Sequence, residues 1–126
     1  MRAVDTNVLV RLVARDDEKQ VATAAAFIQN GVWVSHLVLA EALWVLRTTY
    51  QFEHDQIAAA VDILLNHQDV TVQDAAVVEE ALQQYRDRPA LGFSDCMVLE
   101  IARKAGHLPL GTFDRVLSKL DGVERI

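Results

Sequence analysis

Short apolar runs alternate along this chain with longer stretches in which apolar residues recur at helical spacing. The first run, Arg2–Val4, leads into the polar break Asp5-Thr6-Asn7, and apolar residues with a helical period follow from Val8 to Val13. Short runs of β-forming residues predict strands, and a period near 3.6 predicts amphipathic helices. We therefore expect a strand that turns directly into a helix, with Asp5 at the carboxyl end of the strand.

The same alternation continues to the end of the chain. Further strands are predicted over Val32–Val34, Val70–Val72, Leu108–Thr112 and Val123–Arg125. The predicted helices after the first cover about residues 17–29, 37–49, 53–65, 74–85, 94–105 and 114–120. Strands that alternate with helices indicate an α/β fold, in which a mostly parallel sheet is covered by helices on both faces.

Length and composition place the chain among globular proteins. With 126 residues, 52% of them hydrophobic, it can bury a sizeable core, and we expect residues 1–126 to form one domain. The single cysteine, Cys96, excludes an internal disulfide and fits a reducing compartment, so a cytoplasmic location is expected. No signal-peptide pattern is present, and no apolar run approaches the ~20 residues that span a membrane.

The formal net charge of −6 changes the range of expected partners. Nucleic acids are bound mainly by neutralising phosphates, so an RNA-binding surface would need local basic clusters. Three pairs are candidates for such clusters, Arg11 with Arg15, Arg86 with Arg88, and Arg115 with Lys119. The acidic balance itself suits a protein that holds divalent cations or meets a basic partner.

Four acids are candidates for a cation site. Asp5, Asp95 and Asp114 stand where strands end or helices begin, and each of them alone is equally consistent with a helix cap. Glu41 interrupts the apolar segment Leu37–Leu46, which predicts a buried helix, and a buried carboxylate needs a partner. That partner is either a base, such as Arg2 or Arg47, or a metal shared with other carboxylates.

The type of metal follows from the donor atoms. None of the four histidines is paired with another at ligand spacing, and one thiol does not make a zinc site. Carboxylates without histidine or cysteine partners favour Mg²⁺ or Mn²⁺. The residues alone thus predict a cation site at the edge of a sheet.

The order of these acids resembles that of a known family. The resemblance rests on Val4-Asp5-Thr6-Asn7, on Glu41 in an apolar helix, on Phe93-Ser94-Asp95 and on Thr112-Phe113-Asp114. Together these segments resemble PIN-domain nucleases over the whole chain. The ending, Thr112–Arg115 with Gly122-Val123-Glu124, is especially similar to the VapC toxins of type II toxin–antitoxin operons.

The resemblance implies a three-layer α/β/α sandwich whose mostly parallel central sheet has four to five strands. It also implies a Mg²⁺-dependent endoribonuclease, with Mn²⁺ as a possible substitute, that cuts RNA and leaves a 5′-phosphate. The implied catalytic and metal-binding quartet is Asp5, Glu41, Asp95 and Asp114, supported through hydrogen bonds by Thr6, Asn7, Ser94 and above all Thr112. The implied partners are RNA, a second copy of the chain and a small antitoxin.

The apolar residues of the helices from Leu37 to Leu65, including Trp44, exceed what one small core needs. We therefore expect the dimer or antitoxin surface on these helices.

Three other classes of protein are alternatives. A receiver-type signalling domain also binds Mg²⁺ through acids, and Asp74 could serve as its acceptor, but the predicted strand Leu108–Thr112 lacks the required lysine. A phosphatase of the haloacid type needs a second aspartate at the position of Asn7. A binding module with an inactive metal site has the same sequence features as the nuclease, and RNA cleavage distinguishes the two.

Overall fold

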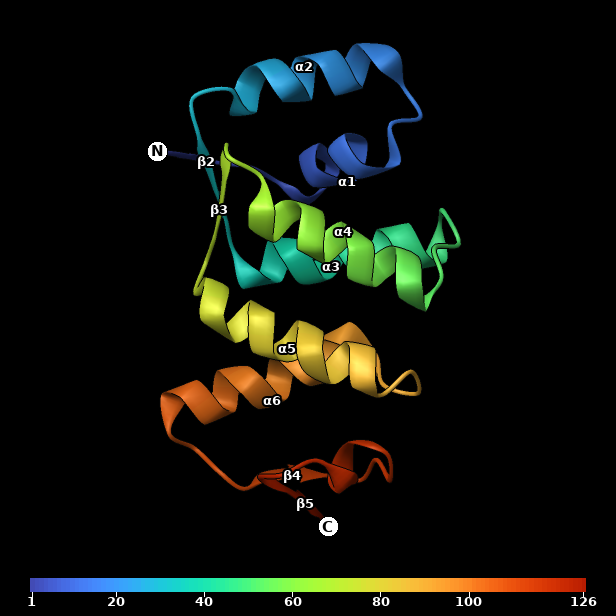
Figure 1. The fold of residues 1–126 in the computed structure, drawn as a ribbon, viewed down its shortest axis with the longest axis vertical. Helices are drawn as coiled ribbons and strands as arrows, with labels where there is room; N and C mark the ends of the chain where they lie inside the picture. Colours follow the sequence, from blue (N-terminus) through green and yellow to red (C-terminus); the bar gives the residue numbers. More distant parts are fainter. The chain divides into compact units, whose positions relative to one another are not determined.

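The computed structural model describes residues 1–126 and divides into two compact units, Met1–Ala75 and Ala76–Ile126. The first unit contains β1 (Arg2–Ala3), α1 (Thr6–Ala14), α2 (Glu18–Ile28), β2 (Val32–Val34), α3 (His36–Thr48), α4 (His54–Asn66) and β3 (Val70–Val72) (Figure 1). The second unit contains α5 (Ala75–Asp87), α6 (Phe93–Ala105), β4 (Leu110–Thr112), the 3₁₀-helix η1 (Leu117–Lys119) and β5 (Val123–Arg125). The first residue of α5, Ala75, is counted with the first unit.

The strands of the first unit form a parallel sheet in the order β1-β2-β3. Trp33 of β2 pairs with Ala3 on one side and with Thr71 on the other. Val32 and Val34 of β2 are buried, whereas Trp33 and Thr71 are exposed. One face of this sheet therefore contributes to the core, and Figure 1 shows α1 to α4 on one side of the strands.

The helices of the first unit pack pairwise. α1 contacts α2 and α3, and α4 contacts α3 and β3. Cap-type residues begin two of these helices: Asp17 accepts a hydrogen bond from the backbone N–H of Gln20, and Ser35 accepts one from that of Val38. These caps satisfy N–H groups that have no partner within the helix, so the helix starts were readable from sequence.

The prediction that the helix around Glu41 is buried on all sides is wrong. The buried residues of α3 form a stripe of Leu39, Ala42, Leu43 and Leu46 at helical spacing. On another side of the helix Leu37 and Trp44 are 69% and 66% exposed, and Glu41 is exposed between them. An apolar composition does not by itself bury a helix, because only the stripe that faces α1 and the core loses contact with water.

The second unit combines two helices with a short parallel pair of strands. β4 pairs with β5 so that Thr112 lies opposite Arg125. The rings of Tyr85 and Phe93 meet edge to face with centroids 5.7 Å apart, and both residues are buried. The strand predicted from Leu108 begins at Leu110, and the helix predicted over 114–120 is reduced to the single turn η1.

The architecture is mixed α/β with parallel strands, as predicted. The five strands form a sheet of three in the first unit and a sheet of two in the second. No helix has both the length and the apolar character needed to cross a membrane.

Candidate metal centre

Asp5 occupies the junction between β1 and α1. It is the N-cap of α1, and its Oδ1 accepts a hydrogen bond of 2.7 Å from the backbone N–H of Thr6. The side chain is nevertheless exposed, and its second oxygen accepts no hydrogen bond from the protein. Asp5 is therefore both a cap and an accessible carboxylate.

Thr6 links this junction to Glu41. Its hydroxyl donates a hydrogen bond of 2.9 Å to Oε2 of Glu41, across the contact between α1 and α3. Thr6 is buried, so its hydroxyl is shielded from water, whereas the side chains of Asp5 and Glu41 are exposed. Neither base expected as a partner pairs with Glu41: Arg2 instead donates to the carbonyl of Phe27 and lies 3.7 Å from the centre of its ring. The hydroxyl, not a cation, orients this carboxylate.

Thr112 and Asp114 form a second local cluster. Oδ1 of Asp114 accepts hydrogen bonds from the backbone N–H groups of Val116, at 2.7 Å, and Leu117, at 2.9 Å. The hydroxyl of Thr112 accepts a hydrogen bond of 3.0 Å from the backbone N–H of Asp114. Thr112 thus holds the backbone of Asp114 in place, whereas Thr6 contacts a carboxylate directly.

Asp95 lies in the first turn of α6, whose N-cap is Gly92. Its carboxylate accepts no hydrogen bond from the protein, so a capping role does not account for it. A Cβ atom placed on Gly92 would lie 3.6 Å from Oδ2 of Asp95, an ordinary van der Waals contact, so the carboxylate lies close to the start of α6. No hydrogen bond joins Asp95 to Thr112 or Asp114, and Asn7 and Ser94 bond to none of the acids.

The four carboxylates fit a hard divalent cation in their donor chemistry. Each keeps at least one oxygen that no protein group contacts through a hydrogen bond, and such oxygens are the ligands that Mg²⁺ and Mn²⁺ prefer. Within each unit taken alone, no three acids, histidines or cysteines form a group that could hold a metal ion. The contacts within the units bring Asp5 together with Glu41 through Thr6, and Thr112 together with Asp114.

Cys96 is a poor metal ligand in this environment. It is fully buried in α6, and this burial, with added repulsion from Asp95 and Glu100, raises the pKa of its thiol to about 12. Thiolates, not thiols, bind metals. Cys96 serves instead as a small buried hydrophobic side chain.

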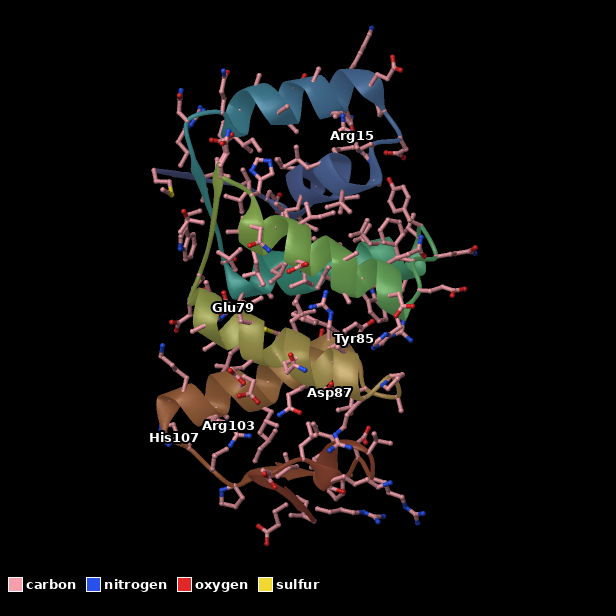
Figure 2. All side chains as sticks on the ribbon, viewed as in Figure 1. Arg15, Glu79, Tyr85, Asp87, Arg103 and His107 are labelled. Carbon is pink, nitrogen blue, oxygen red and sulfur yellow. The ribbon has the colours of Figure 1, made fainter.

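Glu100 is an acid that the sequence analysis did not single out. It is 4% exposed on the buried stripe of α6, and its Oε1 accepts a hydrogen bond of 3.1 Å from Nε of Arg103. Its Oε2 is buried without a partner. Arg103, labelled in Figure 2, also donates to the carbonyl of Asp121 at 2.7 Å, which ties α6 to the turn before β5. The signal for Glu100 was available, because it interrupts apolar positions of a helix as Glu41 does.

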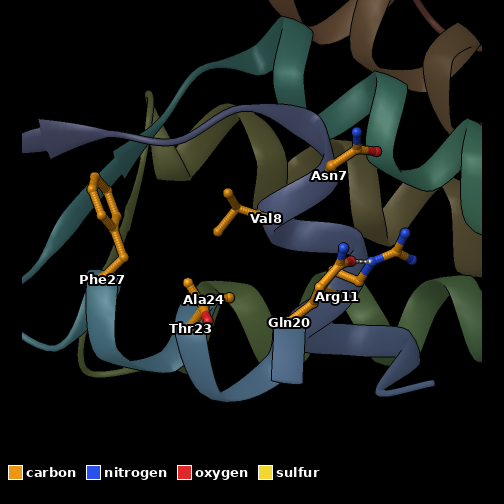
Figure 3. Close-up of a pocket in the computed structure, with 7 residues that line it drawn as sticks. All are labelled: Asn7, Val8, Arg11, Gln20, Thr23, Ala24 and Phe27. Atoms are coloured by element: carbon orange, nitrogen blue, oxygen red, sulfur yellow. Dashed lines mark hydrogen bonds between the residues drawn. The ribbon is translucent and has the colours of Figure 1, made fainter. Parts of the chain in front are cut away.

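A groove of about 370 Å³ lies between α1 and α2 (Figure 3). Its lining combines polar and apolar side chains from both helices. It is lined by Asn7, Val8, Arg11, Gln20, Thr23, Ala24 and Phe27. Arg11 is held by Gln20, by Asp16 and by the hydroxyl of Tyr50, so it is engaged within the protein. None of the four acids lines this groove.

Comparison with known proteins adds to this geometry. Residues 2–123 match the family model described as the PIN domain. The chain is also similar to a VapC ribonuclease of Aquifex aeolicus (strain VF5), with 29% identity over an alignment that covers 95% of this chain and 92% of the relative. No solved structure matches the chain significantly.

Proposed function

Because this chain belongs to the PIN domain family, we propose that it is a Mg²⁺-dependent endoribonuclease and the toxin of a type II toxin–antitoxin pair. PIN nucleases generally use divalent metal ions. The observation that carries the proposal is the hydrogen bond from Thr6 to Glu41, which joins an oriented carboxylate to the residue that follows Asp5, at the carboxyl end of β1. That end of a parallel strand is where open α/β sheets place their ligands.

Hydrolysis of a phosphodiester needs an activated water and neutralised charge, and a bound Mg²⁺, or Mn²⁺ in its place, would supply both. We assign the cation ligands to Asp5 and Glu41 in the first unit and to Asp95 and Asp114 in the second. The hydroxyl of Thr6 keeps Glu41 in one orientation, and Thr112 fixes the backbone that carries Asp114. No side chain is required as a nucleophile, which agrees with the buried, protonated thiol of Cys96.

The proposal extends to the molecule as a whole. Residues 1–126 act as one nuclease domain in the cytoplasm, as a homodimer that a small antitoxin inhibits. The support for a partner surface is the exposure of Leu37 and Trp44 on α3 and of Ile63 on α4. These are large apolar side chains on two helices that contact each other, and a contiguous apolar patch on such a surface would mark a site of protein–protein contact.

The activity is tested with purified protein and a mixture of structured and single-stranded RNAs. Cleavage is expected with Mg²⁺ or Mn²⁺ and not with EDTA. Asp5→Asn, Glu41→Gln and Asp95→Asn should each reduce it by orders of magnitude, while Asp62→Asn on the exposed side of α4 serves as a matched acid control. Undiminished cleavage in EDTA would rule out the metal mechanism, and phosphorylation of Asp74 without cleavage would favour a receiver domain.

The assembly is tested by light scattering over a range of concentrations. Wild type is expected as a dimer, and the combination Trp44→Ser with Ile63→Ser as a monomer, because two exposed apolar anchors are lost. Val98→Ser, which removes an exposed apolar side chain from α6, is the control and should leave the dimer intact. A wild-type protein that stays monomeric at all concentrations contradicts the dimer.

A further inference from the structure

Glu100 is a buried acid that the proposed metal centre does not use. It is 4% exposed on α6, its Oε1 accepts the hydrogen bond from Arg103, and its Oε2 is buried without a partner. A buried carboxyl group with an unsatisfied oxygen costs stability, and a buried pair of this kind is often no more stable than apolar residues of similar volume. Stability therefore does not account for the pair, and the contacts that it orients become the relevant feature.

The guanidinium of Arg103 bridges two elements of the second unit. Its Nε donates to Glu100 at 3.1 Å on α6, and its Nη2 donates at 2.7 Å to the carbonyl of Asp121, in the turn before β5 (Figure 2). The next residue, Gly122, has a φ of 86°, and a Cβ atom placed on it would lie 3.3 Å from Nη1 of Arg103. The glycine thus allows the guanidinium to lie close against the backbone of the turn.

Hydrogen bonds along β4 and β5 connect this turn to Asp114. The carbonyl of Gly122 accepts a bond of 2.8 Å from the N–H of Leu110, the first residue of β4. At the other end of β4, the carbonyl of Thr112 accepts a bond of 2.9 Å from the N–H of Ile126, and the hydroxyl of Thr112 accepts the N–H of Asp114. Displacement of the turn would therefore displace the backbone that carries Asp114.

The helix α6 carries the other acid that the proposed function assigns to this unit. Asp95 lies in the first turn of α6 and Arg103 in its last, so one helix joins the acid to the guanidinium. Arg103 is thus connected to Asp95 through α6 and to Asp114 through the β4–β5 pair. Groups that orient the direct ligands of a metal commonly change its affinity by about 10–100-fold, because they set where those ligands stand.

We propose that Arg103, oriented by Glu100, is a positioning residue of the metal centre that holds Asp114 in a fixed place relative to Asp95. This inference rests on the proposed nuclease function and adds to it a pair of residues that binds neither metal nor RNA. An arginine suits the role because its planar guanidinium donates in several fixed directions at once. A lysine in its place keeps the charge and loses the simultaneous bonds to the two acceptors.

The experiment measures binding of Mn²⁺ without RNA, from the electron paramagnetic resonance signal of the free ion, well below the melting temperature of each protein. Arg103→Lys should raise the Kd for Mn²⁺ about tenfold, because the charge stays while Asp114 loses its fixed place. Glu100→Gln keeps an oxygen that accepts the bond from Arg103, so its Kd should stay close to that of wild type. Val78→Ala, which removes buried methyl groups from α5, is the matched control for lost stability and should leave the Kd unchanged.

A double-mutant cycle identifies the acid through which Arg103 acts. Asp114→Asn weakens Mn²⁺ binding by itself, and Arg103→Lys added to it should weaken binding little further, because both changes act on one ligand. Added to Asp5→Asn, in the first unit, Arg103→Lys should keep its full effect. In the metal-free protein, the amide NMR signals of Val116 and Leu117, which donate to Asp114, should shift in Arg103→Lys. Unchanged signals would mean that Asp114 keeps its place without Arg103 and would overturn the inference.

The outcomes separate this inference from the proposed function. A wild type that binds Mn²⁺ and cleaves RNA, with an equal Kd in Arg103→Lys, overturns the positioning role and leaves the nuclease intact. Equal weakening by Val78→Ala, or a full further loss in the Asp114→Asn background, means that Arg103 acts through stability or through another ligand and also overturns it. A wild type that binds no Mn²⁺ and cleaves no RNA contradicts both.

Discussion

The hydroxyl of Thr6 shows how much of the candidate site depends on one atom. It is buried, and it donates to a carboxylate that is exposed and carries no countercharge from a base. A hydrogen bond to a charged acceptor is worth about 1.5–3 kcal/mol when buried and less at an exposed carboxylate such as that of Glu41. Its effect is chiefly to select one orientation of the carboxylate.

Thr6→Val removes this hydroxyl and keeps the shape of the side chain. We expect about tenfold slower RNA cleavage, equivalent to about 1.4 kcal/mol, because Glu41 loses its fixed orientation. Thr6→Ser should retain most of the activity, and steady-state cleavage assays on the three proteins make the comparison. Equal rates for Thr6→Val and wild type would show that the hydroxyl has only a structural role.

The thiol of Cys96 is a single-residue probe of how tightly α6 is packed in the second unit. It is fully buried, so a thiol reagent should not modify it in the folded protein. Titration with urea should make it reactive in step with the loss of helical circular dichroism. Rapid labelling without denaturant would mean that α6 opens locally, and Cys96→Ala is the control for reaction at other sites.

At the scale of elements, α3 and α6 place their acids in opposite environments. Both helices are apolar and both carry one glutamate within the apolar run, yet Glu41 is exposed and Glu100 is 4% exposed. In α6 Phe93, Cys96, Met97 and Glu100 share a buried stripe, whereas in α3 Glu41 falls beside the stripe that begins at Leu39. The buried glutamate therefore needs Arg103, whereas the carboxylate of Glu41 reaches solvent.

Arg103→Met should destabilise the protein by about 1–3 kcal/mol, because the buried carboxyl group of Glu100 loses its hydrogen-bond donor. The double variant Glu100→Leu with Arg103→Met should recover part of this loss, since no buried charge remains. Urea unfolding monitored by circular dichroism gives both values. A double variant less stable than Arg103→Met would contradict this account of the pair.

At the scale of the whole molecule, metal binding and folding should be coupled. A cation that binds the folded form and not the unfolded chain stabilises the fold by roughly 2.7 kcal/mol at about 100 times its dissociation constant. In a chain of 126 residues each kcal/mol corresponds to about 3–5 °C in the melting temperature. The size of the shift measures binding without any assay of activity.

We expect saturating Mg²⁺ to raise the melting temperature of wild type by roughly 10 °C relative to EDTA. Asp95→Asn should show a smaller shift, because an amide replaces a charged ligand. Asp62→Asn should keep the full shift. A wild type without any shift at millimolar Mg²⁺, or an Asp95→Asn protein with the full shift, would count against the assigned ligands.

The sequence by itself determined the elements of this protein and their order. Apolar period, cap residues and turn residues act over a few neighbouring positions, so β2, β3 and β5 lie where the pattern predicts them. The order of Asp5, Glu41, Asp95 and Asp114 was likewise sufficient to indicate the family, which the match over residues 2–123 confirms. Their roles as ligands stay a prediction.

Tertiary structure alone decided which side of each helix meets the core. The hydrogen bond between Thr6 and Glu41 joins residues 35 positions apart and exists because α1 packs on α3. The same kind of packing buries Glu100, exposes Glu41 and leaves Phe113 uncovered. The composition of a helix does not change when the helix is rotated about its axis. Only contacts between segments distant in sequence decide which stripe of side chains is buried.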